Sequence, residues 1–166
     1  MYKIGEFIVY GNEGVCEVEN ISALDIPGVK NDKNYYTLKP MHDNGKVFAP
    51  VDTKVFMRPV STYDEVQAII GQIDSIEQAD LDDKNARMLE NHYKELMKTH
   101  ECIDLLTVIV NINEKKTKLI ENGKKLGQIE EKFMRSAKSL LEDEFSLVLG
   151  IPKEEVESYI MGKVNK

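Results

Sequence analysis

The chain has 166 residues, a hydrophobic content of 42% and a formal net charge of −7. This length allows one domain or two small ones, and this composition excludes a wholly disordered chain. No apolar run reaches the roughly 20 residues that span a bilayer, and the N-terminus lacks the pattern of a secretion signal. We therefore expect a cytoplasmic protein with no membrane partner.

The negative charge is unevenly distributed along the chain. Residues 1–60 contain 7 basic and 8 acidic side chains, whereas residues 61–166 contain 15 basic and 21 acidic ones. Phosphate contacts dominate the affinity of proteins for nucleic acid, so a nucleic-acid surface on this chain must be local.

Residues 1–60 contain the short β-branched and aromatic runs that are typical of strands. Turn-forming residues separate these runs, as in Gly11–Gly14 and in the loop over residues 25–34. The sequence Asp43-Asn44-Gly45 predicts a two-residue hairpin of type I′, because Asn-Gly accepts positive φ angles. Five short strands over about 60 residues predict a small SH3-like or Tudor-like β-barrel. The expected strands are Glu6–Tyr10, Val15–Ile21, Tyr35–Lys39, Lys46–Ala49 and Val55–Arg58.

A helical pattern begins immediately after this block. Ser61 or Thr62 is suited to cap the first helix, and Asp64 and Glu65 favour its first turn through the helix dipole. Apolar residues then recur at helical spacing over Val66–Ile76, which predicts an amphipathic helix.

Four more helices are expected towards the C-terminus. They begin near Asp82, at the apolar run Cys102–Ile112, near Gln128 and at Lys153–Met161. Taken alone, the second could also be a buried strand, but its helical flanks favour a buried helix. Gly150 is suited to end the third of these, because glycine readily adopts the left-handed conformation that follows a helix.

These patterns together predict an α+β protein with two domains. Residues 1–60 are expected to form the SH3/Tudor-like barrel, and residues 61–166 a compact all-α helical domain.

The sequence offers no constellation for catalysis or metal binding. His92 and His100 are eight residues apart on one expected helix, so a metal between them would span more than about 10 Å of helix rise. Acidic pairs such as Asp82-Asp83 are explained by solvated helix faces. Cys16 and Cys102 are expected to be reduced and buried. We therefore expect no enzyme activity, metal or cofactor.

Basic residues gather in one segment of the helical block. Residues 111–138 contain 8 basic and 4 acidic side chains, a local balance of +4. One interpretation is an ordinary solvated lysine-rich face. The other is a phosphate-contacting patch where two helices meet. Spacing alone leaves both open.

The order of several motifs resembles the CarD/CdnL family of bacterial transcription regulators. The resembling segments are "YKIGEFIVYGNEGVCEV", "YYTLKP", "KVFAPVD" and "MRPV" in the first block, and "EEKFMRSAKSLLEDEF" near the C-terminus. In that last segment Lys132, Ala137, Lys138, Leu141 and Glu144 are in register with the family pattern.

The resemblance implies a division of labour between the two blocks. In the family a Tudor-like module, shared with transcription-repair coupling factors, docks on the RNA polymerase β subunit. The helical block reaches upstream promoter DNA and stabilises the open complex. This chain would then be a non-enzymatic transcription regulator, in which tethering raises the local concentration of a weak DNA contact.

The chain also departs from the family pattern. Many members carry a tryptophan wedge at the edge of the melted DNA, but this chain has no tryptophan and places Asn85 there. Of the basic residues that follow, Arg87 remains. Two arginines used against polymerase are replaced by Leu24 and Phe48.

The resemblance and the residues together assign two candidate surfaces. The polymerase-binding residues are expected to be Leu24, Lys46, Val47, Phe48 and Pro50. The DNA-binding residues are expected to be Arg87, Lys115, Lys116, Lys118, Lys124 and Lys125. The missing tryptophan and the charge of −7 support an alternative, a polymerase-binding protein–protein adaptor without DNA-binding activity. The oligomeric state does not follow from the sequence.

Overall fold

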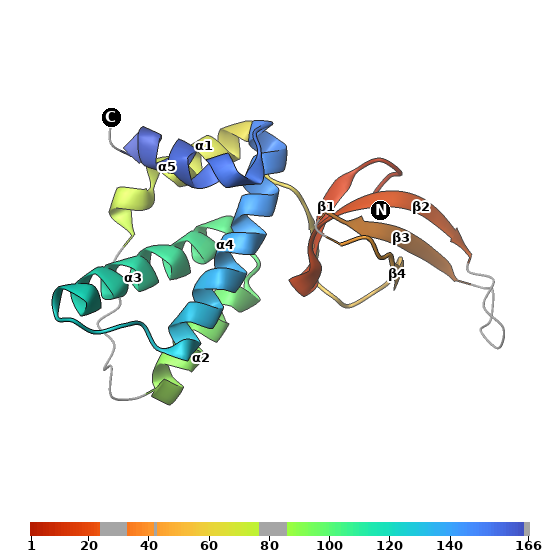
Figure 1. The fold of residues 1–166 in the computed structure, drawn as a ribbon. Coiled ribbons are helices and arrows are strands. Elements are labelled where there is room, and N and C mark those ends of the chain that lie inside the picture. The colour runs from red at the N-terminus through yellow and green to blue at the C-terminus, as the bar shows by residue number, and fades with distance from the viewer. Residues whose placement is uncertain (24–32, 42, 77–85, 165–166) are drawn as a thin grey trace. The chain divides into compact units, whose positions relative to one another are not determined.

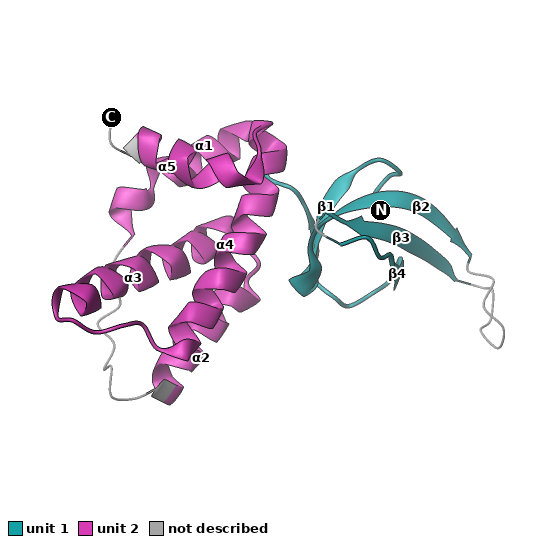
Figure 2. Cartoon of the chain, viewed as in Figure 1, with its two compact units in different colours: residues 1–61 teal, residues 62–166 magenta. Residues whose placement is uncertain are grey.

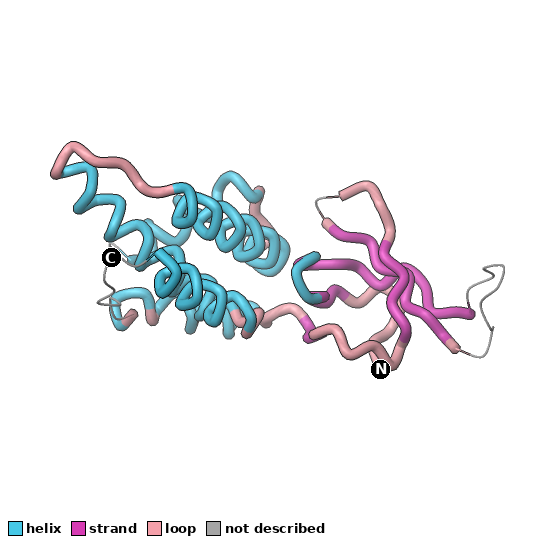
Figure 3. Tube along the Cα trace, turned by 90° about the horizontal axis from the view of Figure 1, so that it is seen from below, coloured by secondary structure: helices cyan, strands magenta, loops and turns pink. Residues whose placement is uncertain are grey.

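The computed structural model of the chain describes residues 1–23, 33–41, 43–76 and 86–164 (Figure 1). The chain divides into two compact units, Met1–Ser61 and Thr62–Lys166 (Figure 2). The described strands all belong to the first unit, and the described α-helices to the second (Figure 3). None of the described helices has both the length and the hydrophobicity to cross a membrane.

The first unit is an antiparallel sheet with the strand order β4-β3-β2-β1-β5. The five expected strands are confirmed, with ends that differ from the prediction by at most two residues. The described strands β4 and β5 are the two edges of the sheet and do not pair with each other, so a closed barrel is not confirmed. The strands are β1 (Phe7–Tyr10), β2 (Gly14–Ala23), β3 (Asn34–Pro40), β4 (Val47–Pro50) and β5 (Met57–Pro59).

The connection between β1 and β2 depends on Gly11. This glycine has a φ of 46° and begins a short 3-10 helix, Gly11–Glu13. Its N–H donates a 2.8 Å hydrogen bond to the carbonyl oxygen of Phe56. A Cβ atom at this position would lie 2.9 Å from Cγ1 of Val55. Both the backbone conformation and the close approach therefore require glycine.

The expected two-residue hairpin between the third and fourth strands is wrong. β3 ends at Pro40 and β4 begins at Val47, so residues 41–46 connect them. Neither Asn44 nor Gly45 has the positive φ angle of a type I′ turn. The Gly45 N–H instead donates a 3.1 Å hydrogen bond to Oδ1 of Asp43. An aspartate side chain that accepts from the backbone two residues on makes a turn without left-handed residues.

A small apolar core holds this sheet together. Strand β4 contributes Ala49 to this core. The hydroxyl of Tyr36, another core residue, accepts a 3.1 Å hydrogen bond from the Tyr2 N–H. Successive residues of a strand point to opposite faces, so the burial of Ala49 turns its neighbour Phe48 outward. The buried residues are Ile8, Cys16, Val18, Tyr36, Leu38 and Ala49.

The described part of the second unit contains five α-helices and two short 3-10 turns. The expected helix over Cys102–Ile112 is confirmed and continues to Glu121. The α-helices are α1 (Tyr63–Gly71), α2 (Ala86–Lys98), α3 (Cys102–Glu121), α4 (Gln128–Leu149) and α5 (Val156–Val164); the 3-10 turns are Ile73–Ser75 and Lys153–Glu155.

Two predicted helix ends are confirmed. Thr62 caps α1 in a capping box: its Oγ1 accepts from the Glu65 N–H at 3.1 Å, and Glu65 Oε1 accepts from the Thr62 N–H at 3.0 Å. Gly150 ends α4 with a φ of 69°.

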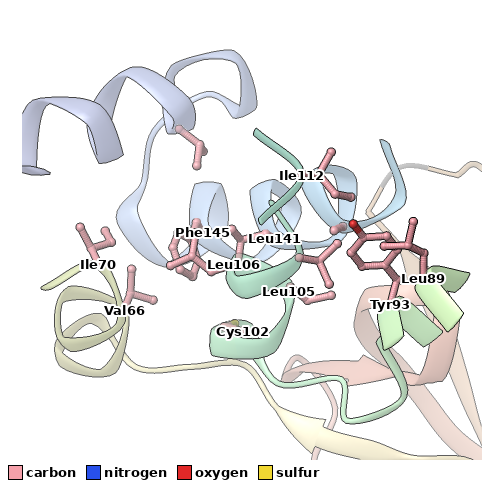
Figure 4. Packing of buried hydrophobic residues seen from close by; sticks show 13 residues of the cluster. Val66, Ile70, Leu89, Tyr93, Cys102, Leu105, Leu106, Ile112, Leu141 and Phe145 are labelled. Carbon is pink, nitrogen blue, oxygen red and sulfur yellow. The ribbon is translucent and has the colours of Figure 1, made fainter. Parts of the chain in front are cut away.

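The core of the helical unit lies mainly between α3 and α4, and α1, α2 and α5 add residues to it (Figure 4). Phe145 of α4 is fully buried and belongs to the same buried cluster as Leu106 of α3 (Figure 4). Tyr93 of α2 packs against Phe133 of α4 with a ring-centroid distance of 5.5 Å. These contacts fix the α3–α4 pair that carries the basic segment.

Candidate functional sites

Strand β4 places an aromatic side chain in solvent at the edge of the sheet. Among the described strands β4 pairs only with β3, with Phe48 opposite Thr37. The Phe48 side chain is 51% exposed, whereas the neighbouring Ala49 is fully buried. An edge strand leaves backbone N–H and C=O groups available to a strand of another protein. β4 therefore offers backbone hydrogen bonds and an apolar anchor on one strand.

Lys46 and Pro50 flank this edge. The Lys46 Nζ atom lies 3.3 Å from Oε2 of Glu19, and the lysine side chain stays largely exposed. Pro50, the last residue of β4, has no N–H to donate. Charged residues and prolines are the means by which natural edge strands avoid indiscriminate pairing. The two residues therefore limit strand addition to a short central stretch of β4.

Lys115 occupies a different position from the other lysines of the basic segment. Its Nζ atom lies 2.5 Å from Oε1 of Glu130, and the side chains of Lys115 and Glu130 are only 18% and 9% exposed. The pair joins α3 to the first turn of α4. Lys115 is therefore less accessible to a phosphate than an exposed lysine, and its contact with DNA stays an untested prediction.

The other four lysines predicted to bind DNA are exposed. Lys116 and Lys118 lie on the last turns of α3, and Lys124 and Lys125 lie on the connection to α4. None of the four forms an ion pair with another described residue. Their ammonium groups are therefore available to an anionic partner.

The connection between α3 and α4 is fixed by local hydrogen bonds. Gly123 has a φ of 71°, and the Lys124 N–H donates to the Leu119 carbonyl at 2.7 Å. The Asn122 side-chain amide donates to the Lys118 carbonyl at 3.0 Å. These bonds satisfy carbonyls that the helix end would otherwise leave without a donor.

A cleft of about 370 Å³ opens between the end of α3, this connection and the start of α4. Its apolar lining comes from Ile120, Leu126 and Met134. Its charged lining comes from Lys116, Lys125, Glu131 and Arg135. The cleft thus combines an apolar surface with three cations and one carboxylate.

The comparison with family models decides what the first unit is. Residues 2–61 match the model of the CarD-like/TRCF RID domain. The first unit is a CarD-like/TRCF RID domain. Domains of this family bind the RNA polymerase β subunit and are interaction domains, not catalytic ones. The match ends where the helical unit begins, and a search of curated proteins gave no match to the chain.

Four of the five residues expected to bind polymerase lie in or beside the edge strand of the RID domain. Lys46, Val47, Phe48 and Pro50 form one continuous stretch with Ala49. Leu24, the fifth, lies outside the described residues. The structure therefore gives this surface an exposed aromatic residue at its centre, while the role of each residue stays a prediction.

The structure does not bring all expected DNA-binding residues into one site. Lys116 and Lys125 line the cleft, but Arg87, exposed in the first turn of α2, does not. Asn85 lies outside the described residues.

Five residues that line the cleft did not enter the site predicted from sequence: Ile120, Leu126, Glu131, Met134 and Arg135. Glu131, Met134 and Arg135 are spaced i, i+3 and i+4 on α4, and residues at this spacing share one helix face. That spacing was a usable signal. No comparable signal in the sequence indicates that Ile120 is 60% exposed, because its residue type does not distinguish it from an isoleucine of the core.

The two cysteines and the described histidines, His92 and His100, are not among the residues of β4 or of the cleft lining. Cys102 is buried and its thiol donates to Oε1 of Glu144 at 3.2 Å. Burial, followed by the negative charge of Glu13, raises the pKa of the Cys16 thiol to about 12. Across the described ranges no three His, Cys, Asp or Glu side chains converge in a way that could hold a metal ion.

Proposed function

We propose that this chain is a non-enzymatic, cytoplasmic transcription regulator that docks on the RNA polymerase β subunit through edge strand β4 of its RID domain. The match of residues 2–61 to the RID family supports an RNA polymerase-interacting, transcription-related protein. The exposure of Phe48 on an edge strand is the observation that carries the docking mode. A polymerase strand would add to β4, and Phe48 would occupy an apolar recess on the β subunit.

The helical unit is proposed to contact upstream promoter DNA and to modulate the stability of the open complex. The residues proposed for phosphate contacts are Arg87, Lys116, Lys118, Lys124 and Lys125, which are all exposed. Lys115 is left out, because it pairs with Glu130. Tethering to polymerase raises the local DNA concentration, so a few lysines suffice on a chain with a charge of −7.

The docking mode is tested by calorimetry of the full chain with the isolated β-subunit lobe. Phe48→Glu is expected to weaken binding by at least about tenfold, because central aromatic anchors dominate interfaces. Ile4→Glu is the matched control, since Ile4 is 61% exposed but lies outside β4. Equal loss in both variants would attribute the effect to charge, and unchanged binding of Phe48→Glu would exclude β4 as the docking strand.

The alternative, a polymerase-binding adaptor without DNA contact, is favoured by the withdrawal of Lys115 into its ion pair. The two functions differ in binding to forked promoter DNA with and without polymerase. A regulator is expected to bind with an affinity that falls with salt, and Lys118→Glu should reduce that slope by about one. An adaptor would leave DNA affinity unchanged when the chain is added to polymerase.

A further inference from the structure

The cleft between α3 and α4 combines features that duplex DNA alone does not use. Its apolar residues include Ile120, which is 60% exposed, and the half-buried Leu126 and Met134. Phosphate groups are satisfied by cations and gain nothing from covering aliphatic side chains. The cleft therefore fits a ligand that carries apolar and anionic groups together.

The charges on the rim narrow the chemistry of that ligand. Lys116, Lys125 and Arg135 place three cations around the cleft, against the single carboxylate of Glu131. None of these cations pairs with a carboxylate of another described residue. Glu131 repels a continuous phosphate chain, but its carboxylate is a good acceptor for a peptide N–H. An acidic polypeptide offers both kinds of partner: its carboxylates can pair with the three cations, and its peptide N–H groups can donate to Glu131.

The cleft is also preformed. The Lys115–Glu130 pair fixes the start of α4 against α3, and the hydrogen bonds around Gly123 fix the connection. A site that is already ordered loses little conformational entropy on binding, so less of the favourable free energy of its contacts is offset by the cost of ordering.

We propose that the α3–α4 cleft is a docking site for an acidic peptide segment of a partner protein, with one bulky apolar side chain of that segment inserted between Ile120, Leu126 and Met134. Aspartate and glutamate side chains that flank the inserted residue pair with Lys116, Lys125 and Arg135. The site goes beyond polymerase docking and does not depend on it. It shares Lys116 and Lys125 with the proposed DNA-binding residues, so peptide and DNA compete there.

The test measures fluorescence anisotropy of labelled peptides with the full chain. The probe has the sequence Glu-Asp-Leu-Phe-Asp-Glu, and two controls replace either its apolar residues by Ala or its acidic residues by Asn and Gln. Only the probe is expected to bind, by a margin of at least about tenfold over each control. Equal binding of the probe and the Ala control would overturn the proposal, because the apolar lining would then have no role; so would no binding of the probe.

Two variants tie binding to the cleft. Ile120→Asp and Arg135→Glu are each expected to weaken probe binding by about tenfold or more, whereas Lys132→Glu is expected to change it less than about twofold. Lys132 is exposed on α4 but does not line the cleft, so it reports the general effect of reversing one charge. Circular dichroism confirms that the variants fold, and Ile120 tolerates substitution because it is exposed.

Oligonucleotides separate this site from the proposed DNA contact. Duplex DNA is expected to bind Ile120→Asp nearly as well as the unchanged chain, apart from one added charge, while Lys118→Glu weakens DNA binding and spares the peptide. If single-stranded DNA binds and depends on Ile120 while the probe does not bind, the cleft is a nucleic-acid site and the peptide proposal is overturned.

Discussion

The ammonium group of Lys115 on α3 lies 2.5 Å from the carboxylate of Glu130 in the first turn of α4. The pair joins residues fifteen positions apart on α3 and α4, the two longest of the described helices. Two charges that are withdrawn from water stabilise a fold only when they stay together. The pair therefore sets the position of the α3–α4 connection, with its exposed lysines and the cleft beneath it.

Removing one partner of this pair should destabilise the helical unit. Lys115→Met leaves the Glu130 carboxylate buried without its cation, at an expected cost of about 2–3 kcal/mol, below that of a fully buried pair because Lys115 is partly exposed. Lys116→Met, one residue away and exposed, is expected to cost less than about 0.5 kcal/mol. Urea unfolding of the three chains measures both. A Lys115→Met chain as stable as Lys116→Met would show that the pair contributes nothing.

Gly127, the N-cap of α4, should resist substitution for a reason unrelated to its φ angle. That angle is −73°, which any residue adopts, but a Cβ atom would lie 2.7 Å from Oε2 of Glu130. Gly127→Ala therefore pushes the Glu130 carboxylate away from Lys115, and we expect a loss of about 1–2 kcal/mol.

A double-mutant cycle isolates this effect. In a Glu130→Ala background the clash is absent, so Gly127→Ala should cost less than about 1 kcal/mol, because only the preference of an N-cap for glycine over alanine then remains. If Gly127→Ala costs the same in both backgrounds, the contact with Glu130 is not the cause.

Local signals were enough to predict most of the elements. Thr62 and Glu65 carry the capping-box pattern at the start of α1. Gly150 ends α4 in a left-handed conformation, which glycine adopts whatever the rest of the chain does. The apolar run from Cys102 was predicted as a helix from its flanks alone. Each of these features depends on residues within a few positions of one another.

The features that were missed depend on tertiary contacts or on loop length. Nothing near Lys115 in the sequence indicates that its charge meets Glu130, since that contact requires the packing of α3 on α4. Asn44-Gly45 has the composition of a two-residue hairpin turn. However, six residues separate the end of β3 at Pro40 from the start of β4 at Val47, so the connection is longer than that turn. Exposure of Phe48 and Ile120 likewise follows only from the assembled fold.

Gly11 should be among the least replaceable residues of the RID domain. Gly11→Ala combines a positive φ of 46° with a 2.9 Å approach to Cγ1 of Val55. The expected loss is about 2–4 kcal/mol, from backbone strain and a steric contact together. Gly5→Ala is the control, because Gly5 has a positive φ of 90° but open space around it.

Amide hydrogen exchange shows which of the two units loses stability in Gly11→Ala. Faster exchange at Ile8 and Val18, with unchanged exchange at Leu106 and Phe145, would place the loss in the RID domain. Val55→Ala should recover part of the stability of Gly11→Ala but none of that of Gly5→Ala. Equal losses for the two glycines would mean that the Val55 contact is without consequence.

Cys16 predicts how the stability of the RID domain changes at high pH. Its thiol has a folded-state pKa of about 12, against an ordinary 9.0, because the side chain is buried and lies near the negative charge of Glu13. A raised folded-state pKa gives a stability contribution that is complete below pH 9 and is lost as the pH rises toward 12. In this range the unfolded chain releases the thiol proton and the folded chain does not.

The free energy of unfolding attributable to Cys16 should therefore fall by about 1.4 kcal/mol per pH unit above its unfolded-state pKa. Comparison with Cys16→Ala removes the effect of other groups that titrate in this range, including Cys102 and the tyrosines. Urea unfolding at about pH 8 and about pH 10 should show the stability gap between the two chains narrowing as the pH rises. A constant difference in stability between the two chains would contradict this prediction. It would mean that Cys16 ionises in the folded sheet, which requires β2 to open locally and expose the thiolate to water.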